Sequence, residues 1–323
     1  MDGNTEVVSD SITLTGAGFT KAFFPEAPLL EESLGKTLEF INYEIKVKKI
    51  STYNNYLEIY KNFQRENRDL EMLLTKYFEF LEKKNNGETI TVGEALEQEA
   101  LGYLKYAFLH LIDSTTPWKS YWKDSDFSTY PESLNFIEYQ RCRKIRELAD
   151  YFIGKRGCDL QVTVNYDTLL DSIFMSFPEP EDHKHKIQHI HGSRAWYFDP
   201  TTDRIFSDSD SRTYSNQPND PLILPIYNKE KWITIFPEQT QEMYLNKIDV
   251  ITEHFKKCKR LTIIGCGLNQ NDEILTGLIN SLDRKCKVIY VANSCKNYEH
   301  IQKIFEKQTV NYLSCGFRVG CLS

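Results

Sequence analysis

Two side chains in the middle of the chain, Asn165 and His191, are of types suited to chemistry on a sugar. Asn165 follows residues 159–164 (DLQVTV), which are predicted to form a strand. Ligands of open α/β sheets bind beyond the carboxyl ends of the strands, and a neutral amide there can hold ribose hydroxyls or a carboxamide. Asp167, two residues further on, either takes part in such a site or caps the helix predicted from residue 168.

His191 follows a second short predicted strand, residues 187–190, and precedes Gly192 and Ser193. Imidazole is the most frequent general base at neutral pH. A lone histidine is, however, more often a buried residue whose ring nitrogens are hydrogen-bonded within the core. A zinc site is a further alternative, because His189 and His191 would face the same side of a strand. It is disfavoured because the remaining members of that histidine run, His183 and His185, lie in a charged, loop-like segment, and we expect no metal.

Glycine turns follow two other predicted strands. Gly16 and Gly18 come after residues 11–15, and this pattern lets a backbone approach a pyrophosphate closely while the amides of the next helix face it. A tight turn without a ligand explains the same pattern. The dehydrogenase fingerprint requires a third glycine where this chain has Lys21, which argues against hydride transfer.

The second glycine turn follows the predicted strand at residues 261–264 and contains Gly265, Gly267 and Asn269, with Asp272 opening the next helix. Another predicted strand, residues 287–291, is followed by two residues suited to the hydroxyls of an adenosine ribose, Asn293 and Ser294. Each of these signals is weak alone, because asparagine and serine are also common turn residues.

Composition limits the class of protein. The 323 residues are 41% hydrophobic, which is enough for one large domain or two modest ones. The net charge of −7 gives no basic footprint for nucleic acid, and no apolar run approaches the roughly 20 residues of a membrane span. The first residues are acidic and polar, unlike a signal peptide, and the eight cysteines form no C-x-x-C pair. We therefore expect a cytoplasmic protein with reduced cysteines.

The pattern of elements predicts an α/β fold, a Rossmann-like parallel sheet covered by helices. Residues 1–10 are expected to be disordered, and residues 11–27 and 154–323 to form the Rossmann-like domain. Residues 28–153 carry aromatic-rich stripes at helical spacing and are expected to form a large helical insertion after the first strand. Residues 222–225 are expected to form a strand or the end of one, and residues 194–220 a long surface loop.

The order of these signals resembles the NAD-binding domain of the sirtuin family, most closely the divergent sirtuin-like NAD hydrolases of bacterial anti-phage defence. The matching segments are residues 16–18 (GAG), 164–167 (VNYD), 191–193 (HGS), 265–269 (GCGLN) and 292–294 (ANS), and residues 221–225 with Lys229 and 68–71 also resemble this group. The chain departs from deacetylating sirtuins, because it has no paired C-x-x-C zinc motifs, no arginine shortly after Pro25, and Val164 in place of a glutamine. The resemblance thus extends to NAD binding and not to acyl-lysine chemistry.

The resemblance implies an NAD+ glycohydrolase that cleaves the nicotinamide–ribose bond and depletes NAD+ once a partner sensor protein or homo-oligomerisation activates it. Asn165 and His191 are the implied catalytic residues. The implied NAD+-binding residues are Gly16, Ala17, Gly18, Phe19, Thr20, Asp167, Ser193, Gly265, Gly267, Asn269, Asp272, Asn293 and Ser294. The alternatives are a catalytically silent subunit that senses NAD+ or an ADP-ribose nucleotide, and a metal hydrolase built on the histidine run.

Overall fold

The computed structural model describes residues 10–24, 26–47, 51–66, 68–115, 160–167, 169–175, 187–193, 196–199, 204–207, 222–292 and 297–314. Residues 1–9, the helix predicted around residues 134–152, and Asn293 and Ser294 lie outside these ranges. Asp10 belongs to the ordered part, since its carbonyl accepts hydrogen bonds from the amides of Lys259 (2.8 Å) and Arg260 (3.3 Å).

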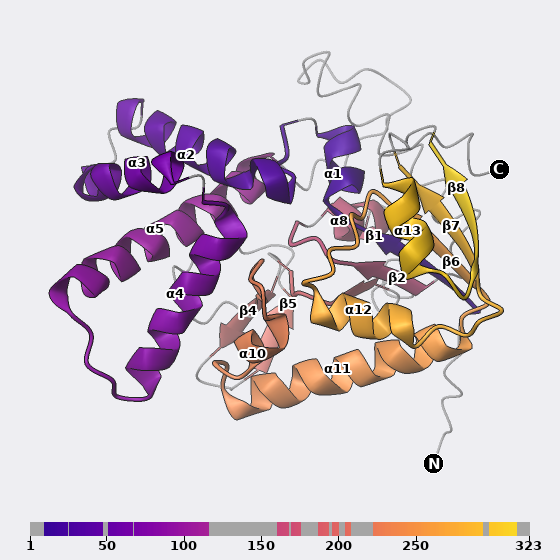
Figure 1. Cartoon of the computed structure of the whole chain (residues 1–323). Coiled ribbons are helices and arrows are strands. Elements are labelled where there is room, and N and C mark those ends of the chain that lie inside the picture. The colour runs from indigo at the N-terminus through magenta and orange to yellow at the C-terminus, as the bar shows by residue number, and fades with distance from the viewer. Residues whose placement is uncertain are drawn as a thin grey trace.

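Six parallel strands form one sheet in the order β3-β2-β1-β6-β7-β8, which confirms the predicted α/β, Rossmann-like fold (Figure 1). The strands are β1 (Ser11–Thr15), β2 (Leu160–Thr163), β3 (Ile187–His189), β6 (Arg260–Ile264), β7 (Lys287–Val291) and β8 (Thr309–Leu313). From β1 the chain builds outward to β3, then returns to the other side of β1 for β6, β7 and β8. The carboxyl ends of β1 and β6 therefore flank the topological switch point, where α/β folds bind ligands.

Helices bury both faces of the central strands. Residues 12–15 of β1 and 261–264 of β6 are all buried, which explains why these strands read as continuous apolar runs with only threonine interspersed. The helices described in the Rossmann-like part are α1 (Ala17–Phe23), α8 (Leu169–Met175), α10 (Lys229–Ile233), α11 (Glu238–Lys257), α12 (Glu273–Asn280) and α13 (Tyr298–Ile304).

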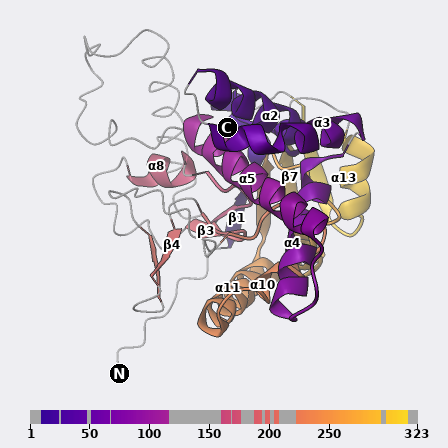
Figure 2. The same cartoon turned by 90° about the vertical axis from the view of Figure 1, so that its left-hand side faces the viewer.

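The described part of the predicted insertion is helical. It contains α2 (Leu30–Lys46), the 3-10 turn η1 (Ser51–Tyr56), α3 (Leu57–Arg65), α4 (Leu70–Asn85) and α5 (Val92–Thr115). Its aromatic stripes face inward, and Tyr60, Phe63, Phe78 and Phe108 are buried in the same hydrophobic core as β1 and β6. The insertion lies to the left of the sheet in Figure 1 and in front of it in Figure 2.

Two sequence-based predictions about local structure were wrong. Residues 222–225 form no strand, and side chains bind two of their carbonyls: the Trp232 indole donates to the Leu222 carbonyl (2.7 Å) and the Tyr166 hydroxyl to the Ile223 carbonyl (2.8 Å). The predicted loop at residues 194–220 contains an antiparallel pair, β4 (Trp196–Asp199) and β5 (Arg204–Ser207). Within the described ranges, no helix is both long enough and apolar enough to cross a membrane.

Candidate active site

A cleft of about 660 Å³ opens at the switch point, between the carboxyl ends of the strands and the helical insertion. That volume lies within the range of roughly 300–1,000 Å³ that is usual for ligand pockets. The predicted site residues that line it are Gly16, Ala17, Gly18, Thr20, Asn165, Asp167, His191, Gly265, Gly267, Asn269 and Asp272. The structure thus brings together residues from four separate segments of the chain.

Two of the predicted NAD+-binding residues do not line this cleft. Phe19 is buried in a small hydrophobic cluster, and its ring packs edge-on against Phe23 at 5.4 Å between centroids. Ser193 is completely buried after β3. Both residues neighbour cleft residues in sequence, but burial in the core leaves their side chains no access to a ligand there.

The two glycine turns interlock. The Gly18 amide donates to the Gly265 carbonyl (2.8 Å), and the Gly16 amide donates to the Ile264 carbonyl (3.1 Å). A β-carbon on Gly16 would lie 2.6 Å from the Cα of Cys266, and one on Gly265, whose φ is +59°, would lie 2.2 Å from the Phe19 nitrogen. Backbone packing therefore accounts for these glycines. The Gly16 and Gly18 amides already donate to backbone carbonyls, so they are not available to a ligand. What these turns provide is a backbone without side chains, which a ligand can approach closely.

Asn165 is held by a hydrogen-bond relay that starts on α1. Its Nδ2 donates to the Thr20 hydroxyl (2.9 Å), and that hydroxyl donates to Asp167 Oδ2 (2.8 Å). Asp167 Oδ1 also accepts the Leu169 amide (3.0 Å) at the start of α8. Burial raises the pKa of Asp167, which the Leu169 and Thr20 hydrogen bonds partly oppose. The relay orients the Asn165 amide, so that its Oδ1 is the atom left to accept a hydrogen bond from a ligand.

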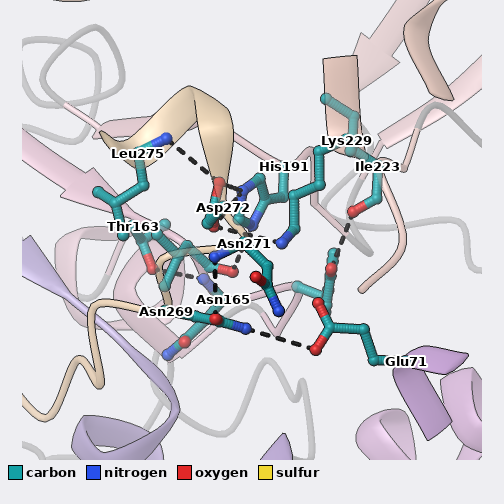
Figure 3. Close-up of polar contacts among 12 residues, drawn as sticks. Glu71, Thr163, Asn165, His191, Ile223, Lys229, Asn269, Asn271, Asp272 and Leu275 are labelled. Atoms are coloured by element: carbon teal, nitrogen blue, oxygen red, sulfur yellow. Dashed lines mark hydrogen bonds and ion pairs between the residues drawn. The ribbon is translucent and has the colours of Figure 1, made fainter. Parts of the chain in front are cut away.

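His191 is engaged at both ring nitrogens (Figure 3). Nδ1 lies 3.2 Å from the Val164 carbonyl, and Nε2 lies 3.0 Å from Asp272 Oδ2. Both partners offer oxygen atoms, so the Val164 carbonyl and the Asp272 carboxylate together fix the orientation of the ring. A buried cation, Lys229, approaches the same carboxylate at 3.5 Å.

Asp272 is the central anion of this cluster. Burial alone would raise its pKa, but His191, Lys229 and the Leu275 amide outweigh burial and lower that pKa to about 2. Asp272 also caps α12 through the Leu275 amide (3.2 Å). The carboxylate therefore fixes three groups at once: an imidazole, an ammonium and a helix start.

The lowered pKa of Asp272 predicts a pH-dependent contribution to stability. A depressed folded-state pKa stabilises the fold above the unfolded value of 3.8, and this contribution is lost as the pH falls toward about 2. We expect the free energy of unfolding of Asp272→Asn to fall furthest below that of wild type at neutral pH. The difference between the two proteins should become smaller below about pH 4. Urea unfolding of both proteins between pH 6 and pH 3 measures this, and Asp249→Asn, an exposed change on α11, should show a small and constant difference. A pH-independent difference for Asp272→Asn would contradict the ion-pair account.

The described histidines of the run, His189 and His191, do not point toward a common site. His189 Nε2 lies 3.0 Å from Asp171 on α8, whereas His191 turns toward Asp272 on α12. The two rings were predicted to face the same side, which fails because β3 ends at His189 and His191 lies in the following turn. In the ranges that the structure covers, no three histidine, cysteine or acidic side chains are grouped to hold a metal, and His183 and His185 lie outside those ranges.

Some cleft residues were not predicted as site residues. In the sequence, Lys229 and Glu71 are marked only by their place in segments that resemble the sirtuin-like group. In the structure both are buried in the cleft wall. Glu71 Oε2 accepts a hydrogen bond from Asn269 Nδ2 (3.4 Å). Phe108 of α5 also lines the cleft, and its ring meets Tyr166 edge-on at 6.4 Å between centroids. The sequence signal for Phe108 was a helical apolar stripe, which indicates a core position equally well.

The sheet order and the position of the cleft define a Rossmann-like α/β protein with a candidate ligand site at its switch point. No protein-family model, curated protein or solved structure matches the chain. Membership of the sirtuin family therefore stays a proposal that depends on the motifs and the geometry of the cleft.

Proposed function

We propose that the protein is an NAD+ glycohydrolase, which cleaves the nicotinamide–ribose bond with water as the acceptor. The observation that supports this most is that Asn165 and His191, from different segments of the chain, line one cleft with the two glycine turns. That cleft has a volume of about 660 Å³. It lies at the edge of the sheet where dinucleotides bind in folds of this class.

In the proposed reaction the bond between the ribose C1′ and the nicotinamide nitrogen breaks, and nicotinamide leaves with the electron pair. Water adds to the resulting oxocarbenium-like carbon and gives up a proton, yielding ADP-ribose. Asn165 Oδ1 would orient the water or a ribose hydroxyl, and His191 Nε2 would take the proton. The glycine turns would let the diphosphate approach the backbone closely.

The contacts of His191 suggest why such an enzyme would be silent until activated. Nε2 faces the Asp272 carboxylate at 3.0 Å and not a substrate, so general-base action by Nε2 requires its release from Asp272. We propose that a partner sensor protein or self-assembly of this chain causes that release in an anti-phage defence response. The protein would act in the cytoplasm and would not bind nucleic acid directly.

The test is a direct assay. The purified protein, alone and with the products of neighbouring genes, is incubated with NAD+, and nicotinamide and ADP-ribose are quantified by chromatography. Stoichiometric release of the two products supports the proposal. NAD+ that stays intact under every activating condition contradicts it.

Thr20 is a positioning residue in this proposal, since it acts through Asn165. Thr20→Val removes the hydroxyl that joins Asn165 to Asp167, and we expect kcat to fall roughly 10- to 100-fold through misorientation of the amide. Thr20→Ser keeps the hydroxyl and should restore most of kcat, with KM little changed in both variants. Equal rates for the valine and serine variants would remove the relay from the mechanism.

A nucleotide sensor without catalysis is the second candidate function, favoured by the engagement of both His191 nitrogens. Such a protein would bind NAD+ or an ADP-ribose nucleotide in the same cleft and change its contacts with a partner. Saturable binding in calorimetry, without turnover in any activating condition, would select this alternative over the hydrolase.

A further inference from the structure

Glu71 places a carboxylate oxygen with no hydrogen-bond partner in the wall of the cleft. The residue is 6% exposed, on the first turn of α4, and lines the cleft from the side of the insertion. Its Oε2 accepts from Asn269, but Oε1 is buried without any hydrogen-bond partner among the described residues. A buried acceptor without a partner is costly, and it needs an N–H or O–H donor that the described residues do not supply.

Lys229 supplies the complementary group. Its ammonium is buried in the same cleft wall, has three hydrogens to donate, and has one ion pair in the described part of the chain, with Asp272 at 3.5 Å. Lys229 is close enough to Glu71 to lower the pKa of that carboxyl, whose net shift is upward because burial dominates. In Figure 3 the two side chains extend from opposite sides toward the space beside Asn269 and Asp272.

A donor next to an acceptor is the pattern that matches a primary carboxamide, whose carbonyl accepts and whose NH₂ donates. A carboxylate on the ligand would instead place two acceptors against the pair and meet repulsion from Glu71. A ribose hydroxyl would use only one of the two groups. Of these three ligand groups, the carboxamide alone satisfies both Glu71 Oε1 and Lys229 Nζ.

We propose that Glu71 and Lys229 form a carboxamide subsite, in which Glu71 Oε1 accepts from the nicotinamide NH₂ and Lys229 Nζ donates to its carbonyl. This inference rests on the proposed function and adds a specificity determinant to it. Glu71 and Lys229 line the same cleft as Asn165 and His191, so a dinucleotide whose carboxamide is held by the pair would occupy the cleft that also contains the two proposed catalytic residues. The subsite also gives the helical insertion a part in substrate recognition, through α4.

The test compares three ligands by calorimetry. Two are carbocyclic analogues of NAD+ and of its nicotinic-acid counterpart, in which a methylene replaces the ring oxygen of the ribose and prevents cleavage. The third is ADP-ribose, which has the hydroxyls but no pyridine ring. Wild type should prefer the carboxamide analogue to the carboxylate analogue by about tenfold or more, as expected for a charge-assisted hydrogen bond exchanged for repulsion.

Glu71→Gln should bring the two analogues to nearly equal affinity, because a glutamine amide can face either group. Its affinity for ADP-ribose should stay unchanged, which also establishes that the variant is folded. Lys229→Gln should weaken both analogues, and Glu79→Gln, an exposed change on the same helix, should match wild type.

The outcomes separate the two proposals. An unchanged preference in Glu71→Gln, or an equal loss for all three ligands, overturns the subsite while leaving the proposed function intact. Failure of the wild-type protein to bind any of the three ligands overturns both.

Discussion

Alanine in place of Gly265 is expected to lower the thermal unfolding midpoint by roughly 6 to 12 °C, corresponding to a loss of about 3 kcal/mol or more. The added β-carbon would lie 2.2 Å from the Phe19 nitrogen and 2.4 Å from the Gly18 carbonyl carbon, and both are backbone atoms that cannot rotate away. The residue also has a φ of +59°, in the left-handed region that favours glycine. Differential scanning calorimetry of the variant and wild type measures the shift.

The same turn provides the matched control. Gly267 lies two residues further on, is exposed, and has no atom within 4 Å of its would-be β-carbon. Gly267→Ala should therefore change the unfolding midpoint by no more than about 2 °C. Equal shifts for the two variants would mean that the interlocked turns are not what makes Gly265 necessary.

If the protein is the proposed glycohydrolase, replacement of Asn165 with alanine is expected to reduce the rate of nicotinamide release by about 100-fold or more, since a positioned polar group in the transition state has that magnitude of effect. Stability should fall by only about 1 kcal/mol, because Thr20 keeps its hydrogen bond to Asp167 after the amide is removed. Product chromatography gives the rate, and urea unfolding of the same samples gives the stability.

Asn280→Ala is a suitable control, since Asn280 is exposed at the end of α12. That variant should keep wild-type activity. If Asn165→Ala released nicotinamide at the wild-type rate, Asn165 would have no catalytic role, and the hydrolase proposal would lose its main support.

The parallel sheet was predictable because its central strands are buried on both faces. Residues 11–15, 261–264 and 287–291 are uniformly apolar apart from threonine, tyrosine and the terminal positions, and helical periodicity between them predicts α/β architecture. Strand order did not follow from these runs. It depends on which side of β1 each later strand packs, which is a tertiary property.

Part of the candidate site was also predictable. Asn165, His191 and both glycine turns follow strands, and carboxyl ends of parallel strands necessarily meet at one edge of the sheet. The partners of these residues were not predictable. Thr20 lies 145 positions from Asn165, and Asp272 lies 81 from His191, so no local pattern connects them.

The error at residues 222–225 concerns hydrogen bonds that no local pattern shows. A short apolar run bounded by prolines is typical of a buried strand, yet Tyr166 and Trp232 occupy the carbonyls that a strand would pair. Only the folded structure reveals that long-range side-chain hydrogen bonds take the place of a neighbouring strand.

The position of β1 between β2 and β6 has a consequence for biosynthesis. The neighbour β6 follows β1 along the chain only some 250 residues later, and the two strands pair in register, as the pairing of Ser11 with Arg260 shows. Until then β1 has an unpaired edge, which is a hazard for misassociation of nascent chains. The cleft is completed only at that late step, because Gly265, Gly267 and Asp272 follow β6, so premature termination before β6 would give a polypeptide without the complete cleft.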